Sequence, residues 1–130
     1  MAIKPDMVGI VVADMARALA FYRLLGLEIP DGQDDEPFVE VITPNGYRIS
    51  WNTQSMIQSI DPHWTPPTGS PRVSLAFKCD TPAEVDNTYA KITATTPSAA
   101  DKAPWDAFWG QRYAILRDPD NNPVDLFAPL

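Results

Sequence analysis

Residues 8–22 read VGIVVADMARALAFY, and this stretch predicts a strand followed directly by a helix. Alternate residues from Val8 to Val12 are large and apolar, which is the period of a strand with one apolar face. Asp14 belongs to the residue types that cap helix N-termini. The apolar side chains between Asp14 and Gly26 recur at helical spacing, and glycine is a common helix stop. A strand and an amphipathic helix therefore open the chain.

The remainder of the first half predicts a hairpin. Residues 38–43 (FVEVIT) and 47–52 (YRISWN) are rich in β-forming side chains, and the turn signal PNG at 44–46 separates them. A short strand at 27–29 is expected between the helix and this hairpin. The first half thus reads as strand, helix, short strand and two paired strands.

The second half repeats this plan. Residues 72–79 (RVSLAFKC) alternate as a strand does, and a helix is expected over 82–92. Strands at 112–117 and 123–127, joined by the turn DPDN at 118–121, close the chain as a second hairpin. We interpret the sequence as a degenerate internal duplication.

These elements predict one α+β domain of two βαβββ half-modules, whose curved mixed sheets enclose a cleft. The half-modules span about 5–53 and about 72–128, and about 54–71 form a linker with a short helical turn. A chain of 130 residues is long enough for one core of this kind. The side chains expected beneath the helices are Val8, Ile10, Val12, Val73, Leu75 and Phe77.

Composition narrows the classes of partner. The net charge of −7, from 17 acidic and 10 basic residues, opposes binding to nucleic acid or to an anionic membrane surface. The single cysteine, Cys79, cannot form an internal disulfide, and no signal peptide or membrane-length apolar run is visible. The expected setting is the cytoplasm and the expected partner is a small molecule.

Two segments carry a family resemblance. Residues 8–22 and 109–127 (WGQRYAILRDPDNNPVDLF) are similar to the opening and closing elements of the glyoxalase/bleomycin-resistance/extradiol-dioxygenase, or vicinal oxygen chelate, superfamily. That superfamily includes isomerases, dioxygenases, thiol transferases and non-catalytic antibiotic binders, so the likeness implies a fold more than a function. Residues 49–69 and 102–130 further resemble the mitomycin-resistance type of antibiotic-binding protein.

The resemblance also locates the positions at which metal-dependent members carry His, Glu or Gln ligands. Here those positions hold Met7, Ser50, Arg72 and Asp125. Only Asp125 is a plausible ligand, and a one-residue slip of the alignment would offer Val8 or Val73 instead. The sole histidine, His63, lies in the linker. Because a Zn²⁺, Ni²⁺ or Fe²⁺ site needs three or four converging donors, we expect no metal and no cofactor.

The resemblance therefore implies metal-free binding and sequestration of a small, planar, largely apolar ligand, such as an antibiotic of the mitomycin or bleomycin type. The alternative is a metal-independent isomerase or lyase with Asp125 or Glu40 as general base and Tyr113 as proton donor. A third is a structural or regulatory dimer with a vestigial cleft. The resemblance implies a homodimer in each case.

Nine residues are candidates for the ligand site. Aromatic rings at 103–110 are expected on a loop, where they either stack on a flat ligand or plug the cleft mouth or the dimer seam. Arg72 is expected to pair with Asp125, because a carboxylate inside a cleft needs a partner. Trp51 and Cys79 are interpreted as core residues. The candidates are Phe38, Ser50, Asn52, Arg72, Trp105, Phe108, Trp109, Tyr113 and Asp125.

Overall fold

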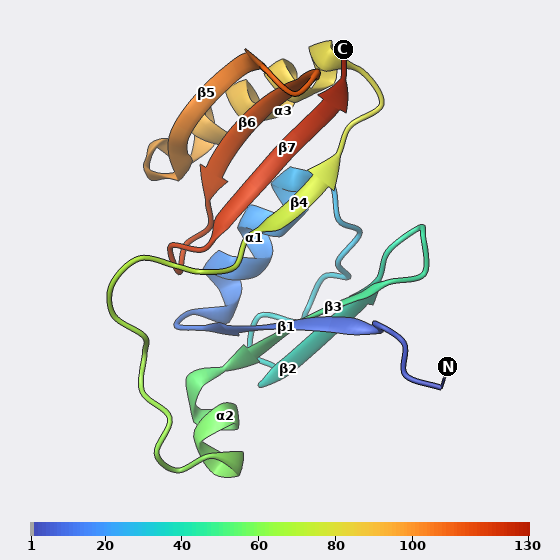
Figure 1. Ribbon diagram of the computed structural model, residues 1–130. Coiled ribbons are helices and arrows are strands. Elements are labelled where there is room, and N and C mark those ends of the chain that lie inside the picture. Colours follow the sequence, from blue (N-terminus) through green and yellow to red (C-terminus); the bar gives the residue numbers. More distant parts are fainter. Residues whose placement is uncertain (1) are drawn as a thin grey trace. The chain divides into compact units, whose positions relative to one another are not determined.

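The computed structural model describes residues 2–130 and confirms the α+β class, with two mixed sheets (Figure 1). The chain divides into two compact units, Met1–Pro67 and Thr68–Leu130. The first unit contains β1 (Met7–Val12), α1 (Met15–Leu25), β2 (Phe38–Ile42), β3 (Arg48–Thr53) and α2 (Gln54–Ile60). The second contains β4 (Leu75–Lys78), α3 (Pro82–Thr95), a 3₁₀ turn (Pro97–Ala99), β5 (Ala100–Ala107), β6 (Gln111–Arg117) and β7 (Pro123–Pro129).

The first sheet has the strand order β1-β3-β2, with β1 parallel and β2 antiparallel to β3. Helix α1 begins as predicted at Asp14, whose side chain accepts a hydrogen bond from the Arg17 amide. It ends at Gly26, whose φ of 114° favours glycine. Tyr22 of α1 packs on Trp51 of β3 with ring centroids 5.3 Å apart, and both side chains are fully buried. Trp51 is therefore the core residue that the sequence predicted.

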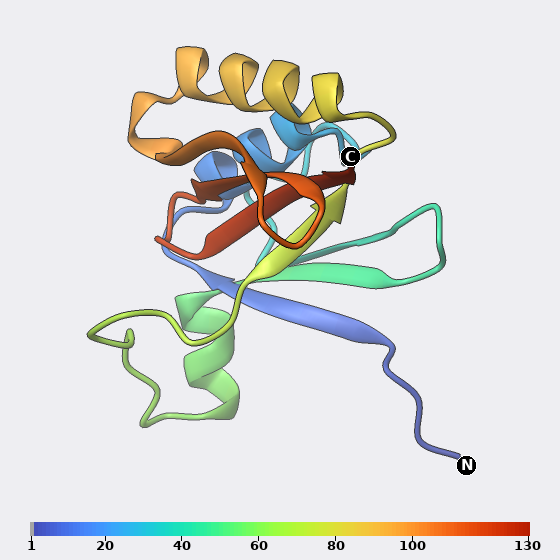
Figure 2. The ribbon, with the colours of Figure 1, turned by 45° about the horizontal axis from the view of Figure 1, so that its top comes forward.

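The second sheet has the order β4-β7-β6-β5, with β4 parallel to β7 and the other pairs antiparallel. Helix α3 lies across one face of this sheet (Figure 2). Val85 and Ile92 of α3 are buried there. Arg112 of β6 donates two hydrogen bonds to the Asp86 carboxylate on α3, at 2.9 and 3.1 Å. The even-numbered residues of β6 therefore face the helix.

The predicted short strand at 27–29 is wrong. Arg23 donates to the backbone carbonyls of Ile29 and Pro30, and the Ile29 amide donates to the carbonyl of Leu27. These bonds direct the backbone polar groups of the segment to α1 and to each other, and Pro30 has no amide N–H. The segment therefore lacks the free backbone groups that pairing with a strand requires. The first sheet consequently has three strands where the second has four.

The first strand of the second unit begins at Leu75 rather than at residue 72. Its partner β7 begins at Pro123, and the pairing starts with Leu75 opposite Val124. Residues 72–74 therefore extend beyond the end of the sheet. Val73, predicted beneath the helix, is 73% exposed.

The segment 103–110, predicted as a loop, lies mostly in β5. Pro104 obscured the strand pattern, because proline is excluded from central strands. It is tolerated here because β5 is an edge strand and its pairing with β6 shifts register between Lys102 and Trp105. Elsewhere the predicted elements agree with the structure to within a few residues, and α2 is the helical turn expected in the linker.

Within residues 2–130, no helix combines the length and the apolarity needed to cross a membrane.

Candidate functional site

A row of aromatic side chains crosses the second sheet. Trp105 of β5 lies opposite Tyr113 of β6, and Tyr113 lies opposite Phe127 of β7. Residues directly opposite one another share a face of a sheet. Since Arg112, the neighbour of Tyr113, points toward α3, the three rings occupy the face turned away from that helix.

Trp109 completes what we call the aromatic cluster, formed by Trp105, Trp109, Tyr113 and Phe127. The Tyr113 ring lies 5.5 Å from Trp105, 5.3 Å from Trp109 and 6.2 Å from Phe127, measured between centroids. The Trp105 and Trp109 rings are 6.1 Å apart and nearly perpendicular. All four distances lie in the range of favourable ring contacts, so the cluster supports itself without a ligand.

The β5–β6 turn positions Trp109. Gly110 adopts a φ of 90° and its amide donates to the Ala107 carbonyl, which reverses the chain after two aromatic residues. Trp109 leans back on the cluster and donates from Nε1 to Gln111 Oε1 at 2.8 Å, yet is 48% exposed. Phe108 is 97% exposed and lies outside the cluster, touching only the Trp109 ring among the described rings.

Asp125 lies beside the cluster on the same face. The Tyr113 hydroxyl donates to Asp125 Oδ2 at 2.6 Å, a length typical of a bond to a charged acceptor. Asp125 is only 9% exposed, and such a carboxylate is costly to bury without a partner. The prediction that Arg72 pairs with Asp125 is wrong. Arg72 is exposed, lies before the start of β4, and forms no ion pair with Asp125 within residues 2–130. Tyr113 takes that role.

Burial raises the pKa of Tyr113 to about 12, and the hydrogen bond and negative charge of Asp125 add to the effect. The hydroxyl therefore stays protonated, and remains a donor, across the physiological pH range. An unfolded tyrosine titrates near pH 10. The stability that Tyr113 contributes is thus fully present below about pH 10 and is lost as the pH rises through about 12.

We expect Asp125→Asn to lower the pKa of Tyr113, because it removes the charge, but to leave it above 10, because burial is the larger cause. The measurement is the ultraviolet absorbance of tyrosinate during an alkaline titration. Subtracting the curve of Tyr113→Phe isolates this residue from the other three tyrosines. A Tyr113 pKa unchanged by Asp125→Asn would show that the carboxylate does not act on the phenol.

Two polar neighbours of the cluster are not among the site residues predicted from the sequence. Lys102 lies with Nζ 4.1 Å from the centre of the Trp105 ring, a cation–π contact. Gln111 accepts the Trp109 indole hydrogen. The spacing of Trp109 and Gln111 around the turn could have indicated the second contact. The contact between Lys102 and Trp105 depends on the irregular register of β5, which the sequence does not reveal.

Three further candidates share one face of the first sheet. Phe38 lies opposite Asn52, and Ser50 lies between Glu40 and Gly9 on the neighbouring strands. Ser50 is fully buried, and its Oγ has no hydrogen-bond partner in the described part of the chain. A Cβ atom at position 9 would come within 3.3 Å of that oxygen, so the glycine keeps the two strands from crowding there. A buried hydroxyl without a partner is uncommon in folded proteins.

The structure also shows the surroundings of two residues discussed from the sequence, Glu40 and Cys79. Glu40 pairs with Arg48 at 2.9 Å on the same face as Ser50, which leaves it less suited to act as a free base. Cys79 is buried, as predicted for a core residue, and burial raises its pKa to about 11. The thiol is therefore unreactive at neutral pH.

The donor set does not suit the metal ion that metal-dependent members of the family hold at these positions. The four positions offer a thioether, a hydroxyl, a guanidinium and one carboxylate, from Met7, Ser50, Arg72 and Asp125. A guanidinium repels a cation, and the carboxylate is already bonded to Tyr113. No group of three His, Cys, Asp or Glu side chains in residues 2–130 is arranged to hold a metal ion.

Comparison with solved structures shows the same fold in bacterial proteins. A glyoxalase/bleomycin resistance protein/dioxygenase family enzyme from Burkholderia phytofirmans PsJN is 22% identical, with a TM-score of 0.84 over 98% of this chain and 100% of the other. A glyoxalase/bleomycin resistance protein/dioxygenase from Nocardioides is 20% identical, with a TM-score of 0.77 over 100% of this chain and 85% of the other. A glyoxalase/bleomycin resistance protein from Albidiferax ferrireducens T118 is 24% identical, with a TM-score of 0.72 over 96% and 98%.

At these identities the likeness shows the fold alone. None of the curated proteins compared with the sequence matches it. The sequence model of one family, the Glyoxalase/Bleomycin resistance protein/Dioxygenase superfamily, matches residues 4–126. The match covers both strand–helix units, the first hairpin and the second hairpin as far as residue 126, and the chain belongs to the glyoxalase/bleomycin resistance protein/dioxygenase superfamily.

Proposed function

We propose that this protein binds a small, planar, largely apolar ligand without a metal ion, on the face of the second sheet that carries the aromatic cluster. The observation that supports this most is the combination of Trp109, half-exposed at the edge of the cluster, with the partly buried Tyr113–Asp125 hydrogen bond beside it. Stacking gives affinity for flat compounds, and the polar pair orients them.

The contacts indicate how such a ligand would be held. One ring stacks on Trp109, which contributes about 0.5–1.5 kcal/mol beyond the burial of area. Tyr113 occupies Oδ2 of Asp125, so that Oδ1 is left to accept from a ligand N–H or O–H. The compound is bound and returned unchanged.

More specifically, we propose that the protein sequesters an antibiotic of the mitomycin or bleomycin type. The likeness of residues 49–69 and 102–130 to the mitomycin-resistance type supports this class of ligand. The same likeness leads us to propose a homodimer, and the fully exposed Phe108 ring is a candidate contact between copies.

A metal-independent enzyme is the second candidate, favoured by the 2.6 Å bond between Tyr113 and Asp125. In that function the carboxylate takes a proton from the substrate and the phenol donates one. A Tyr113 pKa near 12 makes the phenol a weak acid at neutral pH, which favours the binding function over this one. Recovery of a chemically altered compound after incubation would decide for the enzyme.

Titration with a flat antibiotic such as mitomycin is expected to quench tryptophan fluorescence and to leave the compound intact. Trp109→Ala should weaken binding about two- to tenfold, the loss expected for one aromatic contact. The matched control is Trp64→Phe, which removes a tryptophan outside the cluster and should preserve both quenching and affinity. Equal affinity in Trp109→Ala would contradict the proposed site.

A further inference from the structure

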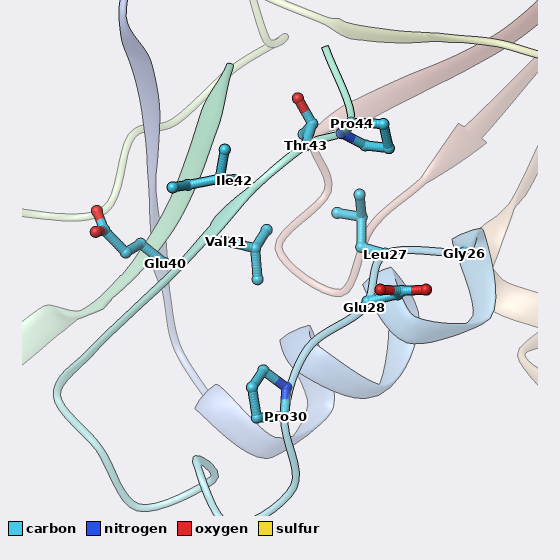
Figure 3. A pocket seen from close by; sticks show the side chains of 9 residues that line it. All are labelled: Gly26, Leu27, Glu28, Pro30, Glu40, Val41, Ile42, Thr43 and Pro44. Atoms are coloured by element: carbon cyan, nitrogen blue, oxygen red, sulfur yellow. The ribbon is translucent and has the colours of Figure 1, made fainter. Parts of the chain in front are cut away.

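The first unit carries a feature that the proposed function does not use, which is a free strand edge beside a cavity. Strand β2 lies at the edge of its sheet. A cavity of about 470 Å³ runs along it, bounded on the other side by the segment that follows α1 (Figure 3). Its lining residues are Gly26, Leu27, Glu28, Pro30 and Glu40 to Pro44.

The lining shows that the cavity flanks the edge of β2 and not one of its faces. Side chains of a strand alternate between the two faces, so a pocket on one face would meet only every second residue. Here three consecutive strand residues, 40–42, line it together with residues 43 and 44 beyond the strand's end. A ligand in this cavity therefore meets the strand's backbone.

The hydrogen bonding of β2 identifies which backbone groups face outward. The Thr53 amide donates to the Pro37 carbonyl, and the Thr43 amide donates to the Tyr47 carbonyl. In an antiparallel pair the direction alternates, so residues 39 and 41 also point toward β3. Phe38, Glu40 and Ile42 present their N–H and C=O groups to the open edge.

The opposite wall does not satisfy these groups. Arg23 and the turn at Leu27 hold the backbone of 27–30 toward α1, as described above. In the second unit the corresponding place beside β6 is filled by β5. The first unit therefore retains space for one more strand, and the β2 edge lacks the lysines or prolines that commonly protect such edges.

Charge indicates the kind of strand that this space accepts. Residues 27–37 (LEIPDGQDDEP) contain five carboxylates and no lysine or arginine. Glu28 lines the cavity, and no ion pair of Glu28 is found in residues 2–130. A second copy of β2 (FVEVI) is a poor occupant, because it carries no lysine or arginine to place beside Glu28.

We propose that the β2 edge binds an extended basic peptide segment of another protein by strand addition. Backbone hydrogen bonds to Phe38, Glu40 and Ile42 give affinity, and a lysine or arginine at the centre of the segment meets Glu28. In the peptide, the apolar residues two positions before and after this basic residue lie opposite Phe38 and Ile42 of β2. These two side chains are 40% and 71% exposed. The site shares no residue with the aromatic cluster.

The experiment uses a capped peptide of sequence leucine–valine–lysine–valine–leucine, five residues long like β2. Binding is followed by amide chemical shifts of the labelled full chain and is expected to shift β2 and residues 27–30. One analogue carries N-methyl groups on the amides that face β2, and another carries them on the alternate amides. The first should bind at least about tenfold more weakly than the second, because it loses several hydrogen bonds.

Charge is tested with a matched pair of variants. Glu28→Lys should weaken peptide binding severalfold, whereas Asp35→Lys, with the same charge change in the same segment but outside the cavity lining, should have little effect. Equal binding of the two methylated peptides, or shifts confined to β5–β7, would overturn the proposal. So would concentration-dependent dimerisation that broadens β2 and is abolished by Ile42→Lys, because a second copy would then hold the edge.

Discussion

Replacement of Trp51 with alanine is expected to lower the free energy of unfolding by about 3–5 kcal/mol, the usual cost of emptying a large buried site. Trp51 is 0% exposed, lies on the central strand of the first sheet and packs against Tyr22 of α1. The substitution would leave a cavity between α1 and the sheet and remove the ring contact with Tyr22. Urea denaturation followed by circular dichroism measures the loss.

Two variants make this prediction specific. Trp51 Nε1 has no hydrogen-bond partner within the described chain, so Trp51→Phe should cost much less than Trp51→Ala because it removes an unpaired buried N–H. Phe108→Ala, at the most exposed large apolar side chain, should change stability by less than about 0.5 kcal/mol. If Trp51→Ala were as mild as Phe108→Ala, the described core of the first unit would be wrong.

Replacement of Tyr113 with phenylalanine is expected to lower the free energy of unfolding by about 1.5–3 kcal/mol, the usual contribution of a hydrogen bond to a charged group. The substitution keeps the ring and its contacts with Trp105, Trp109 and Phe127. It removes the only donor seen to Asp125 among residues 2–130 and leaves a buried carboxylate unpaired. The loss is measured by chemical denaturation at neutral pH.

A double-mutant cycle assigns the loss to the pair. Asp125→Asn keeps an acceptor but removes the charge, so the combined variant should be more stable than the sum of the two single changes predicts. Tyr47→Phe is the control, because that tyrosine lies at the first hairpin with no hydroxyl bond in the described structure, and it should be nearly neutral. Strictly additive losses would show that Tyr113 and Asp125 do not act as a unit.

Local patterns predicted the elements that depend on local physics. The Asp14 cap, the Gly26 stop and both hairpin turns are encoded by a few adjacent residues, and each lies where expected. The family resemblance implies that Asp125 faces the cleft, and strand alternation then predicts that Tyr113 shares its face; in the structure the two residues lie on one face. The fold class and the centre of the candidate site were therefore accessible from the sequence.

The failures share a different cause, which is competition between distant groups. Residues 27–29 have the composition of a strand, but the Arg23 side chain takes the carbonyls that pairing would need. Arg72 was paired with Asp125 by family position, whereas the sheet ends before residue 72 and leaves Tyr113 nearer. Trp105 was placed on a loop because Pro104 masks an irregular edge strand. In the first and third of these cases a contact from outside the segment overrides the local signal, and in the second the end of the sheet overrides the family position.

The position of β7 also determines how this chain can fold during synthesis. β7 is made last in the second unit, yet it lies between β4 and β6 and joins them. A ribosome delivers residues slowly compared with the formation of helices and hairpins. The first sheet can therefore assemble once β3 has emerged, whereas β4 waits exposed without a partner until residues 123–129 leave the exit tunnel.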